Sequence, residues 1–107
     1  MTVKRVVLTA QARAEVRQAT AWYRNEGGPT LARRWVAAVE SAVRHIGAHP
    51  GSGSARYAAP LKLREIRFWP IRGFPYLIFY IERDQQVDVS RVLHAERDIP
   101  AWMGALE

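Results

Sequence analysis

The first half of the chain repeats apolar residues at the spacing of an α-helix. Between Ala10 and Glu26 the sequence contains no glycine or proline, and apolar residues recur every three or four positions. This spacing predicts a helix, and Thr9 can cap it by offering its hydroxyl to the free amides of the first turn. A short strand over Val3–Leu8 is expected before it. The apolar stripe of the predicted helix consists of Ala12, Val16, Ala19 and either Trp22 or Tyr23.

A second helical pattern follows a break in the first. Gly27, Gly28 and Pro29 cannot continue a helix, because two flexible residues precede one with a fixed φ. Thr30 can cap the next helix, which we expect to end near Ala48. The short connection predicts that the two helices form an antiparallel hairpin. The stripe of the second helix runs through Leu31, Trp35, Val39, Ala42 and Ile46.

The apolar period changes to two in the second half of the chain. The loop His49–Ser54 separates the halves, and alternation from Leu61 onward predicts a strand that Pro70 and Gly73 interrupt. Two further strands are predicted on either side of a turn at residues 83–86. Their ranges are Tyr76–Glu82 and Val87–Leu93, and a short helix over Ile99–Leu106 is expected to begin at Pro100.

These elements predict an α+β fold in the order β-α-α-β-β-β. Three successive strands with short links favour an antiparallel β-sheet, with the helical hairpin packed on one face. A chain of 107 residues suits one domain, and neither half could bury its apolar face alone. We therefore expect a single domain over residues 1–107.

The charge of the chain points to an acidic partner. Lysine and arginine number 16 against 10 acids, giving a net charge of +6 at pH 7, which favours nucleic acid or an acidic polypeptide. A GC-rich coding sequence is an alternative reason for the excess of arginine over lysine. The sequence also lacks a leader pattern and an apolar window long enough to span a bilayer. We therefore expect a cytoplasmic protein with no membrane partner.

Motifs that announce an enzyme class or a bound group are missing from the sequence. It contains no cysteine, which excludes disulfides and thiolate metal sites. It also lacks a glycine-rich phosphate loop, the zinc motif HExxH and an obvious pair of strand-end carboxylates. We therefore expect neither a metal ion nor a cofactor.

A run of basic residues follows the predicted loop and could bind phosphates. Five bases are opposed only by Glu65, and aromatic residues between them could stack on nucleic-acid bases. The alternative is that Arg64 and Arg67 occupy the solvated face of an edge strand, where charge discourages aggregation. The five bases are Arg56, Lys62, Arg64, Arg67 and Arg72.

The last predicted strand ends in a polar cluster. His94 beside Asp98 could act as a general base, with Arg91 or Arg97 stabilising the charge that develops. The alternative is structural, because Asp98 can cap a terminal helix and Arg97 can pair with an acid. The residues alone leave both interpretations open.

The aromatic residues fall into two groups. Trp22, Tyr23 and Trp35 have helical spacing and are expected to pack in the core or between the helices. A second group is harder to bury in so small a domain and predicts an exposed apolar groove, where a partner helix could lie. That group consists of Trp69, Phe74 and Trp102.

The order and spacing of several short segments resemble the ParE branch of the RelE/ParE toxin superfamily, the toxin halves of bacterial toxin–antitoxin pairs. The resemblance extends from Val3 to Pro100, and its most specific part is VLHAERD at residues 92–98. The family has the same β-α-α-β-β-β order as the one predicted above. The other segments are AEVRQATAWYRNEGG, HPGSGS, LREIRF and YLIFY.

The resemblance implies that the protein binds DNA gyrase and traps its complex with cleaved DNA, without breaking bonds itself. Toxins of the RelE branch instead cut messenger RNA on the ribosome, using a central-strand arginine and a C-terminal tyrosine. Here Leu77 takes the place of that arginine, and Trp102 is the aromatic residue nearest to the missing tyrosine. Tryptophan has no acidic hydroxyl to exchange a proton, and leucine cannot stabilise an oxyanion. We therefore expect no catalytic residue and keep the ribosome-dependent ribonuclease as an alternative.

The resemblance also implies a ParD-like antitoxin, with a DNA-binding ribbon-helix-helix part and an acidic C-terminal segment that folds over the toxin. Contact with DNA would then be indirect, through the antitoxin or gyrase. A non-toxic relative that serves as a binding partner or co-repressor is a further alternative. We predict target binding by Arg64, Arg67, His94, Arg97, Asp98 and Trp102. We predict antitoxin binding by Trp22, Tyr23, Trp69, Phe74 and Tyr76.

Overall fold

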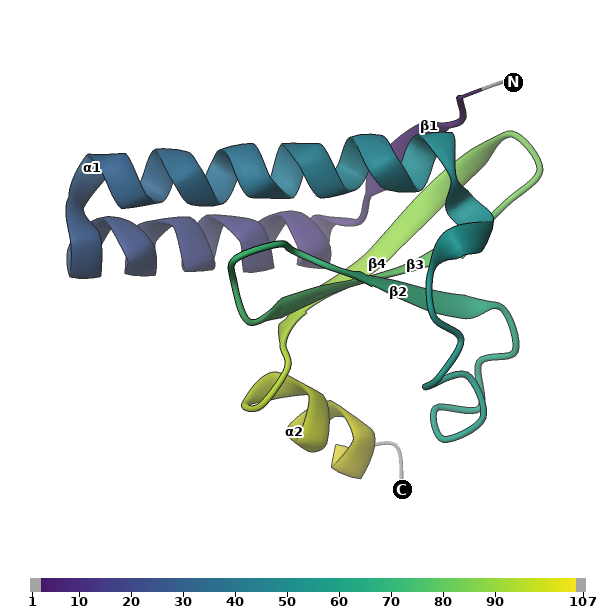
Figure 1. Ribbon diagram of the computed structural model, residues 1–107. Helices are drawn as coiled ribbons and strands as arrows, with labels where there is room; N and C mark the ends of the chain where they lie inside the picture. Colours follow the sequence, from purple (N-terminus) through teal and green to yellow (C-terminus); the bar gives the residue numbers. More distant parts are fainter. Residues whose placement is uncertain (1–2, 106–107) are drawn as a thin grey trace.

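The computed structural model describes residues 3–105 and contains the elements that the sequence predicts (Figure 1). The first strand begins later than expected, and the predicted helix end at Leu106 lies outside the described residues. The elements are β1 (Arg5–Leu8), α1 (Ala10–Ala48), the 3-10 turn η1 (Pro50–Ser52), β2 (Ile66–Pro70), β3 (Tyr76–Glu82), β4 (Gln86–His94) and α2 (Asp98–Ala105).

Helix α1 is bent back on itself, so its two halves form the predicted antiparallel hairpin (Figure 1). Thr9 caps the first half as expected, since its hydroxyl accepts a hydrogen bond from the N–H of Ala12 at 3.1 Å. The bend is at Gly28, whose φ of 81° suits glycine far better than other residues. Helical geometry resumes at Pro29, so the prediction that Thr30 caps the second half is wrong.

The sheet has the order β1-β4-β3-β2, and β1 pairs with β4 in parallel. The predicted meander of β2, β3 and β4 is confirmed, but the prediction of a purely antiparallel sheet is wrong. The helical hairpin explains the difference. It returns the chain to the start of β1, where the N–H of Lys4 donates to the carbonyl oxygen of Gly47 at 3.0 Å. Strand β2 therefore sets out in the direction of β1, and after two reversals β4 also runs in that direction.

The predicted strand from Leu61 to Glu65 does not form, and β2 begins only at Ile66. The N–H of Leu61 donates to Tyr57 O and that of Leu63 to Ala58 O, which are turn contacts rather than ladder contacts. Lys62 has a φ of 56°, which a β-strand does not accommodate. The turn buries the side chain of Leu61 under the sheet, at 4% exposure, and this burial outweighs the preference of the alternating pattern for a strand.

The sheet separates two apolar cores. Helix α1 covers one face and the much shorter α2 covers part of the other (Figure 1). We call the larger cluster the hairpin-side core; its buried members include Trp35, Ile46, Tyr76, Ile78, Tyr80, Val87, Val89 and Val92. We call the smaller cluster the α2-side core; its buried members are Leu61, Ile66, Phe79, Leu93 and Ile99.

A β-bulge in β4 decides which side chains reach each core. Ser90 is an extra residue between the partners of Phe79 and Tyr80, so the register of β3 against β4 shifts there. As a result Val89 and Val92, an odd and an even position, both belong to the hairpin-side core. Simple alternation along this strand would have placed one of them on the opposite face.

Helix α2 starts at Asp98, and Pro100 is its third residue rather than its first, so the predicted start is corrected by two positions. Ile99 buries its side chain in the α2-side core and anchors the helix under the sheet. Neither α1 nor α2 combines the length and the apolar character that a bilayer span requires.

Candidate functional site: a cavity where β4 ends

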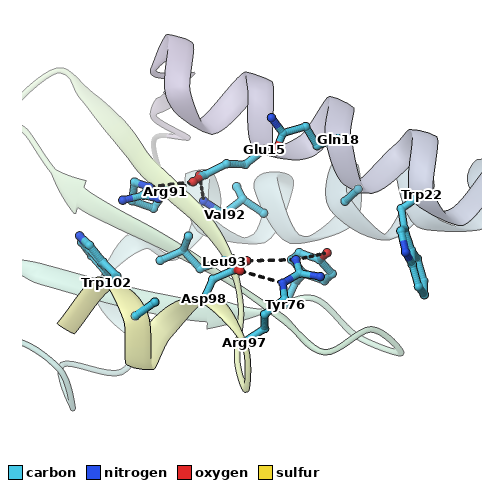
Figure 2. Close-up of a pocket in the computed structure, with 12 residues that line it drawn as sticks. Glu15, Gln18, Trp22, Tyr76, Arg91, Val92, Leu93, Arg97, Asp98 and Trp102 are labelled. Atoms are coloured by element: carbon cyan, nitrogen blue, oxygen red, sulfur yellow. Dashed lines mark hydrogen bonds and ion pairs between the residues drawn. The ribbon is translucent and has the colours of Figure 1, made fainter. Parts of the chain in front are cut away.

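A cavity of ≈ 570 Å³ opens between the first half of α1, the end of β4 and the start of α2 (Figure 2). We call it the β4-end cavity. Polar and aromatic side chains from these elements, from the start of β3 and from the turn before α2 line it, namely Glu15, Gln18, Trp22, Tyr76, Arg91, Arg97, Asp98 and Trp102. It therefore unites Arg97, Asp98 and Trp102 of the predicted target-binding set with Trp22 and Tyr76 of the predicted antitoxin-binding set.

Arg97 and Asp98 form a two-point ion pair beside the cavity (Figure 2). Arg97 Nε donates to Asp98 Oδ1 at 2.8 Å and its Nη2 donates to Oδ2 at 3.3 Å. Nη2 also reaches the hydroxyl oxygen of Tyr76 at 3.3 Å. Hydrogen bonding by the arginine lowers the pKa of Asp98 below its usual value, and Asp98 in turn raises the pKa of Arg97. Both groups are charged at neutral pH and hold each other in place.

His94 is positioned as a hydrogen-bond acceptor. Its Nδ1 accepts from the backbone N–H groups of Glu96 and Arg97, each at 3.2 Å. A neutral imidazole that accepts at Nδ1 carries its proton on Nε2. The nitrogen that could take a proton is therefore already occupied, which does not suit a general base. The ring lies edge-on to Tyr76, with a centroid separation of 5.3 Å.

Glu15 is a central residue of the site that the sequence interpretation missed. Its carboxylate contacts Arg91 Nη2 at 2.7 Å, and the two side chains are only 15% and 21% exposed. The same carboxylate accepts the backbone N–H of Val92 at 2.8 Å (Figure 2). The available signal was an acid on α1 beside the buried positions Ala12 and Ala19, because an acid next to an apolar stripe needs a partner.

Two tryptophans flank the cavity in different states. Trp102 packs edge-on against Phe79 at 5.1 Å and stacks under the guanidinium of Arg91 at 5.3 Å. Trp22 is 53% exposed, so it is not the core residue that helical spacing suggested. Its apolar surface is available to a binding partner.

The remaining predicted antitoxin-binding residues lie away from the open part of this cavity. Tyr23 is 8% exposed and packs between Trp35 and Phe74, and its burial raises the pKa of its hydroxyl. Trp69 stacks flat on His45 with ring centroids 3.8 Å apart. Trp69 and His45, but not Tyr23, line a second cavity, of ≈ 740 Å³, between the second half of α1 and the end of β2. The predicted set is therefore divided between two surfaces and the core.

The predicted target-binding residues Arg64 and Arg67 are separate from the polar cluster at the end of β4. They line a smaller pocket, of ≈ 300 Å³, at β2, an outer strand of the sheet. Arg67 is half-buried and donates to the carbonyl oxygen of Gly53 at 2.8 Å, while Arg64 is exposed. Within residues 3–105, no group of three or more histidine and acidic side chains is arranged to hold a metal ion.

Comparisons with known proteins add an independent finding. The chain matches the family described as "ParE toxin of type II toxin-antitoxin system, parDE" over residues 6–99. A comparison with curated protein sequences gave no match. Among solved structures, a chain of the "Chromosomal ParDE TA system from P. aeruginosa" superposes with a TM-score of 0.73 at 17% identity, covering 88% of this chain and 98% of that chain. At 17% identity, this structural similarity shows that the two chains share a fold.

Proposed function

Because the chain belongs to the ParE toxin family of type II toxin–antitoxin systems, we propose that it inhibits DNA gyrase by binding, stabilises the enzyme's complex with cleaved DNA, and is neutralised by a ParD-like antitoxin. Gyrase acts in the cytoplasm, so the proposal also places this toxin there. Contact with DNA is made through gyrase or through the antitoxin.

The observation that carries a binding role is that the polar side chains at the end of β4 are already engaged in contacts within the protein. Arg97 is engaged by Asp98, Arg91 by Glu15, and His94 Nδ1 by backbone N–H groups. A general base needs a free lone pair, and an oxyanion needs unpaired donors. A preorganised polar surface between two tryptophans suits recognition of another protein.

Neutralisation by direct competition follows from the same geometry. Trp22 and Tyr76, assigned to the antitoxin, line the same cavity as Arg97 and Trp102, assigned to the target. One occupant of a cavity of this size excludes another. The proposed antitoxin therefore blocks the gyrase-binding surface itself and needs no change in the backbone of the toxin.

The proposal is tested with purified toxin, gyrase and relaxed plasmid. We expect the toxin to reduce supercoiling and to increase linear plasmid after protein digestion, and we expect the antitoxin to reverse both effects. Intact supercoiling at excess toxin contradicts the proposal. A translating extract serves as the parallel assay, because codon-specific cleavage of messenger RNA there would support the ribonuclease alternative.

A further inference from the structure

The second half of β4 lacks a neighbouring strand on one side. Parallel pairing with β1 ends where Leu8 meets Val89, and the N–H of Thr9 makes the last ladder contact to Val89 O. Beyond this point α1 begins, and within residues 3–105 no strand continues alongside residues 90–94. An edge of this kind presents backbone groups that can pair with another chain.

Two carboxylates stand where the missing strand would be. The N–H of Val92 donates to Glu15 Oε1 at 2.8 Å, and the N–H of His94 donates to Asp98 Oδ2 at 2.9 Å (Figure 2 shows the first residue pair and the position of Asp98). These amides are two positions apart and both point away from β3, whereas the N–H of Ala95 points toward β3 and donates to Pro75 O. Carbonyl oxygens of an added strand would meet them at the same spacing.

The outer edge of β2 is closed in a different way. Phe68 exchanges two backbone hydrogen bonds with Ser54 at 2.9 Å, and Pro70 has no N–H to offer. That cover is part of the backbone of the fold. The covers on β4 are side chains, which can rotate away without any change in the main chain.

Charge indicates what could replace the two covers. When Glu15 and Asp98 leave the edge, Arg91 and Arg97 lose their ion-pair partners. A replacing segment must therefore bring acidic side chains, and the net charge of +6 favours such a segment. A helix does not suit a row of edge amides, since its carbonyl oxygens, apart from those of the last turn, are used in its own hydrogen bonds. The occupant is an extended chain.

We propose that the edge of β4 at residues 91–94 is a docking site for an extended acidic peptide segment, which pairs with the backbone of Val92 and His94 and displaces Glu15 and Asp98. The two acids are removable covers that protect the edge in the free protein. This inference rests on the proposed function only in that the antitoxin is the chain expected to supply the segment.

The first test measures binding of a fluorescein-labelled peptide of alternating glutamate and valine to the full chain, by fluorescence anisotropy. Two matched peptides separate backbone pairing from charge: one has N-methylated alternate amides, and the other has glutamine in place of glutamate. We expect the parent peptide to bind and both matched peptides to lose most of that binding. Equal binding of the N-methylated peptide, stronger binding of a helical acidic peptide, or no binding of the parent overturns the proposal.

The second test uses the covers themselves. E15A removes a competitor for the edge, so we expect it to bind the parent peptide about fivefold more tightly, while R91A binds more weakly. E15Q keeps an acceptor for the N–H of Val92 but loses the charge, so we expect a smaller gain in peptide affinity. It also keeps the test valid if E15A does not fold. E40A carries the same charge change at an exposed position of α1 and leaves affinity unchanged.

Unchanged or weaker binding by both Glu15 variants, with the fold intact by circular dichroism, overturns the proposal. The peptide assay contains no gyrase, so its failure is distinguishable from failure of the proposed function. Intermolecular contacts between peptide Hα protons and the amide protons of Val92 and His94, observed by NMR, would locate the added strand directly.

Discussion

The two faces of the sheet differ in how completely they are covered. On the hairpin side, Trp35, Ile46 and Tyr80 are fully enclosed at 0% exposure under two helical segments. On the other side a short helix and turns cover a smaller core, whose partly buried neighbours include Trp102 and Met103. The hairpin-side core therefore contributes most to the stability of the fold, whereas the α2-side core leaves some of its side chains near the surface. The β4-end cavity lies where these two faces meet, so a rigid core supports an accessible site.

The largest expected effect is on the hairpin side. W35A should lower the free energy of unfolding by about 4 kcal/mol, because it leaves a cavity among Tyr23, Phe74 and Tyr76 and removes the hydrogen bond from Trp35 Nε1 to Thr20 Oγ1. Urea unfolding followed by circular dichroism measures the loss. W22A, at an exposed position of the same helix, is the matched control and should cost less than about 1 kcal/mol. Equal losses for the two variants would contradict the division between core and surface.

A smaller loss is expected in the α2-side core. I99A removes a side chain that is 2% exposed, but α2 is short and can shift to fill the space, so the loss should be about 2 kcal/mol. The same unfolding experiment compares it directly with W35A. If I99A proves as destabilising as W35A, the two faces contribute equally and the comparison fails.

The third prediction separates function from stability. Arg97 is 62% exposed, so R97A should change the free energy of unfolding by less than about 1 kcal/mol. Its contact with a partner should matter more, and we expect about tenfold more R97A than wild type to be needed for the same gyrase inhibition. R34A removes an exposed arginine from the helical hairpin and should inhibit as the wild type does. Undiminished inhibition by R97A would place the target surface elsewhere.

The smallest effect is a dependence of stability on pH. Since Arg97 lowers the pKa of Asp98 in the folded state, this carboxylate stabilises the fold above its unfolded pKa of about 3.9, and the contribution is lost as pH falls through the lower folded value. Its magnitude should stay below about 1 kcal/mol, because the arginine is largely exposed. The difference in unfolding free energy between wild type and D98N, measured from pH 6 down to pH 2, should shrink on acidification. A constant difference would show that the ion pair contributes nothing.

Local sequence signals predicted the parts of the fold that depend on local physics. The Thr9 cap, the break before Pro29 and the range Tyr76–Glu82 all follow from spacing and backbone preference. The parallel pairing of β1 did not, because it depends on where the hairpin returns the chain. The failed strand at Leu61 shows burial overriding alternation.

The candidate site was predictable only in part. The end of β4 and the start of α2 are close in sequence and rich in polar residues. The sequence alone could therefore place Arg97, Asp98 and Trp102 in one site. Glu15 is far from them in sequence, and its role depends on a backbone amide that a bulge and a missing neighbour leave free. A contact between a side chain and a distant backbone amide produces no recognisable pattern of residue types in the sequence.

The position of β4 in the sheet also affects how the protein is made. It lies between β1 and β3, yet it leaves the ribosome after both of them. During translation β1 has no partner strand until residues 86–89 emerge. Until then the apolar face of the helical hairpin is also not fully covered by the sheet. The β4-end cavity, which residues 91–93 help to line, therefore forms only after β1, β2 and β3 have been synthesised.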